Sequence, residues 1–390
     1  MRILYFSRGY TTHDRRFLAG LSNAGHEVYF LRLENHASIP CGVELPPCVR
    51  LVRWNAPANA PLTRGDFSVL LPEYKRVLDT LKPDLVQAGP IQSCAWLTAA
   101  AGFRPFVAVS WAYDMLRDAD LDLASRSTTR FALENADLVV ADCEEVKRKI
   151  KELGGVPEEQ IVQFPWGVDL CQLDRVQPLP SLRTSAADFL VISTRSLETS
   201  YGVETLCEGF RLAHKVDPGI RLMILGTGSR HEFVSEFIEH NALTGSVTIL
   251  GWVSNENLPA YLKACNLYLS CSPVDGSSVS LLEAMAAQLP AIVTDRPSNR
   301  EWIADGENGW LVPAGDCEAL SKALLAASRM PREVLVAIGR RNRRVIEERA
   351  NWRRNFPKLL EPLERLPRGV PNSLATPSVA HSHCVLTPSC

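Results

Sequence analysis

A run of small polar residues at 270–280 ends an apolar segment and leads into a helical pattern with a single acidic residue, Glu283. Gly276, Ser277 and Ser278 let the backbone come close to a ligand. The N–H groups in the first turn of a helix have no partners within the helix, and the helix dipole adds partial positive charge there. This segment is therefore predicted to bind an anion such as phosphate.

Glu283 is the only charged residue in the early part of this helix, where its neighbours are Leu281, Leu282, Ala284 and Met285. The two oxygens of a carboxylate accept two hydrogen bonds at once, which suits the pair of hydroxyl groups on a ribose. A salt bridge or a capping contact is the alternative. Together with the preceding loop, Glu283 predicts a nucleotide site.

The pattern Asp275-x7-Glu283, followed by Ala-Met-Ala286, resembles the E-x7-E signature of retaining glycosyltransferases of family four. These enzymes have the GT-B fold, with two Rossmann-like domains facing each other across a cleft. The resemblance implies that Glu283 holds the ribose, that the first acidic position faces the donor sugar, and that the amides between them hold the diphosphate. Here the first acidic position is Asp275, one methylene shorter than the usual glutamate.

Other segments of the second half also resemble this family. Arg195 matches an arginine that binds the donor phosphates, whereas Tyr201 stands where lysine is usual. Gly226 lies in the family's glycine turn, and Trp252 and Val253 lie in the segment against which the base packs. The resemblance assigns catalysis to Asp275 and Arg195. It assigns donor binding to Gly9, Arg195, Gly226, Trp252, Val253, Asp275, Gly276, Ser277, Ser278, Val279, Ser280 and Glu283.

The loop after the first apolar run carries Gly9, which corresponds to the family's glycine-rich turn beneath the donor diphosphate. Asp14 is expected to cap the helix that follows. Three positive charges lie nearby: Arg8, Arg15 and Arg16. One of the arginines is a candidate to replace the lysine absent at Tyr201; a solvated helix face is the alternative.

The segment from Val109 to Leu116 matches the family's His-Gly-x-Asp region, with Trp111 where histidine is common. Because Trp111 replaces that histidine, a catalytic histidine is expected only if His13 reaches this position from the neighbouring loop. Trp111 and Tyr113 are candidates for a platform under a sugar ring, with core packing as the alternative. The residues predicted on the acceptor side are Tyr10, His13, Arg15, Trp111, Tyr113 and Asp114.

No metal and no other cofactor are predicted. Asp118-Ala-Asp120 is a DxD, but it precedes a helical pattern, so acidic residues at a helix start are expected. The eleven cysteines include no CxxC pair, which indicates free thiols. Gly226-x-Gly228 lacks the third glycine of a dinucleotide fingerprint, which disfavours an NAD-dependent enzyme.

The 390 residues carry a net charge of −2, so composition gives no reason to expect a nucleic-acid partner. The N-terminal apolar run is too short for a signal peptide, and no apolar run reaches the length of a membrane span. We therefore expect a cytoplasmic protein. The basic patch Lys147–Lys151 is the feature that favours weak peripheral contact with the inner membrane face and a lipid-linked acceptor. The oligomeric state is left open.

Short apolar runs alternate with helical patterns along the whole chain, which indicates α/β domains with parallel sheets. Strands are expected at 3–6, 27–31, 85–87, 106–110, 138–141, 189–193, 221–225, 247–250, 267–270 and 291–294. Helices are expected at 14–24, 203–215, 230–240, 258–264, 279–288 and 317–328. The predicted organisation is an acceptor domain at 1–170, a linker at 171–188, a nucleotide-sugar domain at 189–340, a C-terminal helix region at 341–366 packing back on the first domain, and a disordered tail at 367–390.

The resemblance implies a hexosyltransferase that moves a sugar from a nucleotide-sugar to an unidentified acceptor, with retention and without a metal. UDP-sugars are favoured over GDP-sugars by their frequency in the family. Synthesis of a polysaccharide, glycolipid or cell-envelope glycoconjugate is the expected setting. The alternative is a non-catalytic member that keeps the nucleotide-sugar site, because Trp111, Tyr201 and Asp275 depart from the family pattern.

Overall fold

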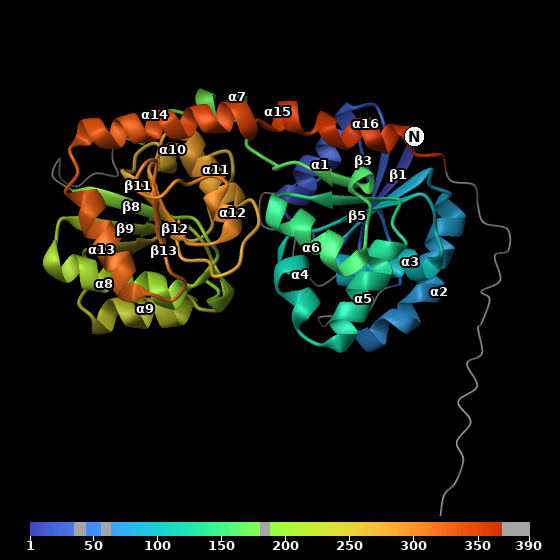
Figure 1. Ribbon diagram of the computed structural model, residues 1–390, viewed down its shortest axis with the longest axis horizontal. Helices are drawn as coiled ribbons and strands as arrows, with labels where there is room; N and C mark the ends of the chain where they lie inside the picture. The colour runs from blue at the N-terminus through green and yellow to red at the C-terminus, as the bar shows by residue number, and fades with distance from the viewer. Residues whose placement is uncertain (35–43, 56–63, 180–187, 369–390) are drawn as a thin grey trace, which may run out of the picture.

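The computed structural model describes residues 1–34, 44–55, 64–179 and 188–368. They form two α/β domains that lie side by side (Figure 1). The part of the predicted linker at 180–187 and the predicted tail from residue 369 lie outside the described residues. Within the described part of the chain, no helix is both long and apolar enough to span a membrane.

The first domain is built on a seven-stranded sheet of order β3-β2-β1-β4-β5-β6-β7, in which every pair is parallel. Its strands are β1 (Arg2–Ser7), β2 (Glu27–Arg32), β3 (Val49–Val52), β4 (Leu85–Gly89), β5 (Phe106–Val109), β6 (Leu138–Ala141) and β7 (Ile161–Gln163). Its helices include α1 (Thr12–Asn23), α2 (Arg64–Leu81), α3 (Trp96–Ala101), α4 (Tyr113–Leu116), α5 (Leu123–Glu134) and α6 (Glu144–Gly154).

The second domain repeats this plan with a parallel six-stranded sheet of order β10-β9-β8-β11-β12-β13. Its strands are β8 (Phe189–Ser193), β9 (Ile220–Ile224), β10 (Val247–Ile249), β11 (Leu267–Ser270), β12 (Ala291–Thr294) and β13 (Trp310–Val312). Its helices include α8 (Val203–Val216), α9 (His231–His240), α10 (Leu258–Leu262), α11 (Val279–Ala286), α12 (Pro297–Arg300) and α13 (Cys317–Ser328). The prediction of two Rossmann-like domains is confirmed.

All ten predicted strands are present, within two residues at each end. The three that were not predicted, β3, β7 and β13, are three or four residues long and lie at sheet edges. Helix α1 begins at Thr12, not at Asp14. Thr11 is its N-cap, and the Asp14 carboxylate accepts a hydrogen bond from the Thr11 N–H, which completes a capping box.

The chain crosses between the domains twice, and the two crossings are hydrogen-bonded to each other. The N–H of Val168 donates to the Ala350 carbonyl at 2.8 Å, and the N–H of Trp352 donates to the Val168 carbonyl at 3.0 Å. The outgoing crossing continues into α7 (Leu170–Arg175), which occupies the start of the predicted linker. Gly167 has a φ of +67°, and a Cβ there would lie 2.1 Å from the Ala350 oxygen.

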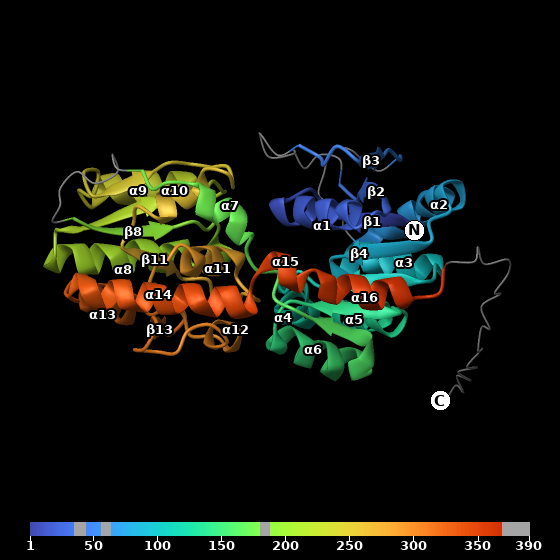
Figure 2. The same ribbon diagram turned by 90° about the horizontal axis from the view of Figure 1, so that it is seen from above.

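The returning chain runs through α14 (Arg332–Arg349), α15 (Trp352–Asn355) and α16 (Pro357–Arg365), which pass along one side of both domains (Figures 1 and 2). Phe356, Leu359 and Leu363 are buried in one cluster with Phe17 and Leu18 of α1. The predicted packing of the C-terminal helix on the first domain is confirmed, and α16 belongs to that domain's core.

Candidate active site

A cavity of about 280 Å³ lies between the two domains. Its walls come from the start of α1 in the first domain and, in the second, from the segments after β8, β9 and β10 and from α11. Strands β8 and β11 are neighbours although they are not consecutive, so the cavity lies at the switch point where ligands of such sheets bind. Seven predicted donor residues line it: Arg195, Gly226, Trp252, Val253, Val279, Ser280 and Glu283.

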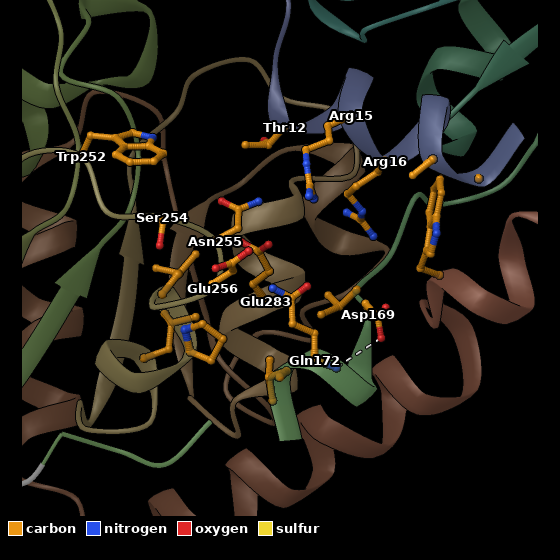
Figure 3. Close-up of a pocket in the computed structure, with 18 of the residues that line it drawn as sticks. Thr12, Arg15, Arg16, Asp169, Gln172, Trp252, Ser254, Asn255, Glu256 and Glu283 are labelled. Atoms are coloured by element: carbon orange, nitrogen blue, oxygen red, sulfur yellow. Dashed lines mark hydrogen bonds between the residues drawn. The ribbon is translucent and has the colours of Figure 1, made fainter. Parts of the chain in front are cut away.

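A second cavity of about 280 Å³ adjoins the first and extends it along α1 towards α7 and Trp352 (Figure 3). Both are lined by Arg16, Trp252, Asn255 and Glu283, so they form one continuous cleft. In Figure 3, Arg15 and Arg16 point from α1 into the cleft, with Glu283 on the side of the second domain. Residues of both domains therefore face the same space.

Arg195 is the centre of the polar contacts in the cleft. Its Nη2 lies 3.0 Å from a carboxylate oxygen of Asp275. Its Nη1 donates to the hydroxyls of Ser278 and Ser280 at 3.0 and 3.1 Å. The guanidinium carbon lies 4.2 Å from the centre of the Tyr201 ring. The residue in the usual lysine position thus supplies an aromatic face under the arginine rather than a second positive charge.

The N-terminus of α11 lies beside Arg195 and has no side-chain cap. Its N-cap residue, Ser278, accepts a hydrogen bond from Arg195 and does not bond to the helix backbone. First-turn amides and a guanidinium therefore converge, an arrangement suited to the oxygens of a diphosphate. Burial raises the pKa of Asp275, and the positive charge of Arg195 opposes this effect.

Glu283 lies in the second turn of α11 and faces the cleft. No hydrogen bond or ion pair from another described residue ends on its carboxylate. Burial raises its pKa to about 7, and the positive charge of Arg16 opposes this effect. The salt-bridge and capping alternatives are thus not what the structure shows. The carboxylate is free to accept hydrogen bonds from a ligand.

The first domain presents His13 and Arg16 to the same cavity. Arg16 donates to the Gly167 carbonyl at 2.8 Å, and its guanidinium lies 4.6 Å from the centre of the Trp352 ring. The His13 ring lies 6.3 Å from that of Trp111, which occupies the family's histidine position. Burial and the charges of Arg16 and Arg195 lower the pKa of His13 to about 3, so its imidazole is neutral at pH 7.

Several predicted residues do not line either part of the cleft. Tyr10 is buried and donates to the Glu44 carbonyl at 2.9 Å. The Asp114 carboxylate holds its own loop together through the Ser110 hydroxyl and the amides of Ile91, Trp111 and Met115. Gly9 is likewise absent from the cavity walls, and so are four other predicted donor residues: Asp275, Gly276, Ser277 and Ser278. Arg8, proposed as nearby positive charge, is paired with Glu34 at 2.7 Å.

The two aromatic candidates for a sugar platform are also engaged elsewhere. Trp111 packs edge-on against Trp166 with ring centres 4.9 Å apart. Tyr113 donates its hydroxyl to the Ser200 carbonyl of the second domain at 2.7 Å. These contacts favour the packing alternative for Trp111 and make Tyr113 part of the contact between the domains.

Among the residues missed from the sequence, Asn255 and Leu258 line both parts of the cleft, and two others support it. Tyr268, on β11, donates its hydroxyl to Ser280 at 2.8 Å and so supports the residues around Arg195. Asp142 follows β6 in the first domain and accepts a hydrogen bond from the N–H of Ser277 at 2.8 Å. The only indication in the sequence that Asp142 belongs to the site is its position as an acidic residue directly after a strand. Nothing in the sequence shows that it meets a loop 135 residues later.

The basic patch at 147–151 is largely neutralised by acidic side chains. Lys147 and Lys151 pair with Glu158 at 2.7 and 2.9 Å, and Lys149 pairs with Asp120 at 2.6 Å. Asp120 lies in a short helical turn at 118–120, as the helix-start interpretation of the DxD expected. Among the described residues, no group of three His, Cys, Asp or Glu side chains is arranged to hold a metal ion. Metal-independent transfer remains a prediction.

Comparison with known proteins gives the family. Residues 8–167 match the glycosyl transferase 4-like domain, and residues 180–350 match the glycosyl transferases group 1 domain. The chain belongs to the group 1 glycosyltransferases. The colanic acid biosynthesis glycosyltransferase WcaL of Escherichia coli is 28% identical over 218 residues, which are 54% of this chain and 53% of WcaL. The chain spans about half the length of the first curated relatives that it matches.

Solved structures share the fold at low identity. A sucrose-phosphate synthase from Thermosynechococcus elongatus superposes with a TM-score of 0.78 and 18% identity, covering 94% of this chain and 99% of that one. HepE of Anabaena, crystallised with UDP and glucose, gives a TM-score of 0.74 and 17% identity, covering 94% of this chain and all of HepE. This group 1 glycosyltransferase therefore has the GT-B architecture that the sequence predicted.

Proposed function

We propose that this protein transfers a sugar from a UDP-sugar to a sugar or lipid-linked acceptor, with retention of the anomeric configuration and without a metal ion. The observation that carries the proposal is the cleft itself. An arginine, Arg195, and the uncapped start of α11 form an anion site, and the unpaired carboxylate of Glu283 lies next to it. Diphosphate and ribose are next to each other in UDP-, GDP- and ADP-sugars.

The chemistry requires that a nucleoside diphosphate leave as an anion. Arg195 and the first-turn amides of α11 would stabilise that charge, and such preorganised donors are worth roughly 3–4 kcal/mol each in a transition state. Asp275, held by Arg195 at 3.0 Å, would orient hydroxyls of the donor sugar near the developing positive charge. The walls from both domains would keep water from hydrolysing the donor.

The base would pack on Trp252, whose side chain is 41% exposed at the cleft. The UDP and glucose bound by HepE support UDP as the nucleotide. The role of WcaL in colanic acid biosynthesis supports a polysaccharide or cell-envelope glycoconjugate as the product. The acceptor would enter from the first domain. Of the acceptor-side candidates, His13 and Arg15 line the cleft.

The test is binding and turnover with UDP-, GDP- and ADP-sugars. We expect a UDP-sugar to raise the melting temperature of the protein, and we expect this shift to be lost in Glu283→Ala. Release of UDP in the presence of an acceptor establishes catalysis. A thermal shift that persists in Glu283→Ala would contradict the assignment of Glu283 to the ribose. A preference for GDP- or ADP-sugars would contradict the choice of UDP as the nucleotide.

Binding without transfer is the second candidate. Arg195 is already paired with Asp275, and Tyr201 brings an aromatic ring where the family has a positive charge. Both features reduce the net positive charge available to a leaving diphosphate. This alternative would be favoured if the protein bound UDP-sugars but released no UDP with any sugar or lipid-linked acceptor.

A further inference from the structure

The loop at the start of α11 is held from the first domain by one acidic residue. Asp142 directly follows β6 and is 4% exposed. Its Oδ2 accepts the N–H of Ser277 at 2.8 Å, and its backbone carbonyl accepts the Ser277 hydroxyl at 2.8 Å. Ser277 is thereby tied at two points to a residue of the other domain.

The close approach at this point depends on Gly276. A Cβ on Gly276 would lie 2.2 Å from a carboxylate oxygen of Asp142 and 2.5 Å from the Cβ of Ala112. Ala112 belongs to the first domain and has a φ of +65°, a conformation that non-glycine residues seldom adopt. The two domains therefore fit together tightly at the loop.

The residues on either side of this contact bond to Arg195, which lines the cleft. Asp275 pairs with Arg195, and Ser278 accepts a hydrogen bond from Arg195. The two residues between them, Gly276 and Ser277, lie against the first domain. The loop before α11 is thus held by Arg195 and Ser298 in the second domain and by Asp142 in the first.

Structural stability alone does not explain a carboxylate at position 142. Its second oxygen, Oδ1, is buried without a nitrogen or oxygen donor, and the thiol of Cys143 is a weak hydrogen-bond donor to the carboxylate. An ionised group with one such oxygen is expensive to bury, and an amide side chain, which keeps an acceptor for the Ser277 N–H, would cost less. Burial raises the pKa of Asp142 to about 7, with a contribution from the nearby charge of Asp275. Residues that break such rules cluster where function requires them.

We propose that Asp142 is a positioning residue for donor binding: by holding Ser277 from the first domain, it fixes the α11 amides in the geometry that binds the donor diphosphate. This inference rests on the proposed function of the cleft as a nucleotide-sugar site. It adds that the first domain shapes the phosphate site of the second, so the site is complete only when the two domains touch.

The first test is the affinity for UDP in the full chain, measured by calorimetry. We expect Asp142→Ala to weaken UDP binding roughly tenfold, as the loss of a hydrogen bond to a charged group implies. Asp142→Asn, which keeps an oxygen acceptor, is expected to retain most of the UDP affinity of the unaltered protein. The direction of the change in UDP affinity separates the two explanations. If Asp142 had no positioning effect, removing its negative charge near a diphosphate would strengthen UDP binding.

The matched control is Glu301→Ala, which removes another contact between the domains. Glu301 accepts the N–H of Glu144 at 3.0 Å and does not contact the loop. We expect this variant to bind UDP as the unaltered protein does. An equal loss in Glu301→Ala and Asp142→Ala would overturn the proposal, because loosened domains alone would then explain both results.

A second measurement needs no ligand. Hydrogen exchange of peptides covering 275–283 is expected to speed up in Asp142→Ala and to stay unchanged in Glu301→Ala. Unchanged exchange in Asp142→Ala would overturn the positioning role. If the unaltered protein bound no UDP at all, the proposed function would fail, while this measurement would still decide whether Asp142 holds the loop.

Discussion

Glu283 combines a central place in the cleft with a carboxylate that titrates near neutral pH. Its pKa of about 7 means that roughly half of the unliganded molecules carry a proton there at pH 7. Ribose hydroxyls donate hydrogen bonds best to the ionised form. We therefore expect the affinity for UDP-glucose to rise roughly tenfold between pH 6 and pH 8. Calorimetry measures this directly, and phosphodiester groups of the ligand do not titrate in that range.

Glu283→Gln is the control for this pH dependence. The variant is expected to bind more weakly at pH 8 and to lose the rise in affinity between pH 6 and pH 8. Any slope that is left should be a fall, because Asp142 ionises in the same range and adds negative charge near the phosphates. The same rise in Glu283→Gln as in the unaltered protein would show that another group is responsible.

The same pKa predicts an effect on stability without ligand. Because burial raises the pKa of Glu283, the free energy of unfolding falls as the pH rises from the ordinary carboxyl range to about 7. Glu283→Gln removes this loss. We expect the variant to be more stable by about 1–2 kcal/mol at pH 8 and equally stable at pH 4, as measured by urea unfolding.

Arg16 and Arg8 form a natural pair of variants for the question of what replaces the missing lysine. Arg16 lines the cleft opposite Glu283, whereas Arg8 is paired with Glu34. We expect Arg16→Ala to weaken UDP binding and Arg8→Ala to leave it unchanged. Equal affinities in both variants would rule out a role for Arg16. Melting curves show whether the contacts of Arg16 with Gly167 and Trp352 affect the fold.

At the scale of residues, more of the predicted donor residues than of the predicted acceptor-side residues line the cleft. Arg195 and Glu283 could be singled out because they lie in local motifs, one at a strand end and one on a helix face. Tyr113 and Asp114 lie in an equally local motif, but the structure uses them for packing and loop closure. Asp142 was missed because its partner, Ser277, is far away in the sequence.

At the scale of elements, the crossing between the domains depends on Gly167. Its φ of +67° and the Ala350 oxygen, 2.1 Å from where a Cβ would lie, both exclude a side chain. Gly167→Ala is expected to lower the free energy of unfolding by roughly 1–3 kcal/mol. Gly25→Ala is the control, because Gly25 has a φ of +84° with open space around it. Urea unfolding should show the larger loss at Gly167, and equal losses would contradict the close contact.

The elements that could be predicted are those whose residues bury a continuous apolar face. The inner strands of both sheets are of this kind, for example β5, in which all four residues are buried. The edge strand β3 carries exposed residues on a short segment, so its pattern resembles that of a loop. Helix α7 was not predicted either, because a segment of only six residues is too short to show a continuous apolar face.

At the scale of the whole molecule, the core of the first domain includes a helix from the end of the chain. Leu359 on α16 is fully buried there, while its neighbour Lys358 is exposed. Leu359→Ala is expected to destabilise the first domain by about 2–5 kcal/mol, and Lys358→Ala to have almost no effect. Limited proteolysis should cut the first domain of Leu359→Ala before the second. Preferential cutting of the second domain would contradict this assignment of α16.

The position of α16 also has a consequence for synthesis on the ribosome. Topologically, the second domain is an insertion into the first, whose last helix is translated after the whole second sheet. The apolar face of α1 around Phe17 and Leu18 therefore stays uncovered while the inserted domain emerges and folds. The domain that is translated first completes its core last. A chain that stops near residue 350 would carry a finished second domain beside a first domain with an open, aggregation-prone face.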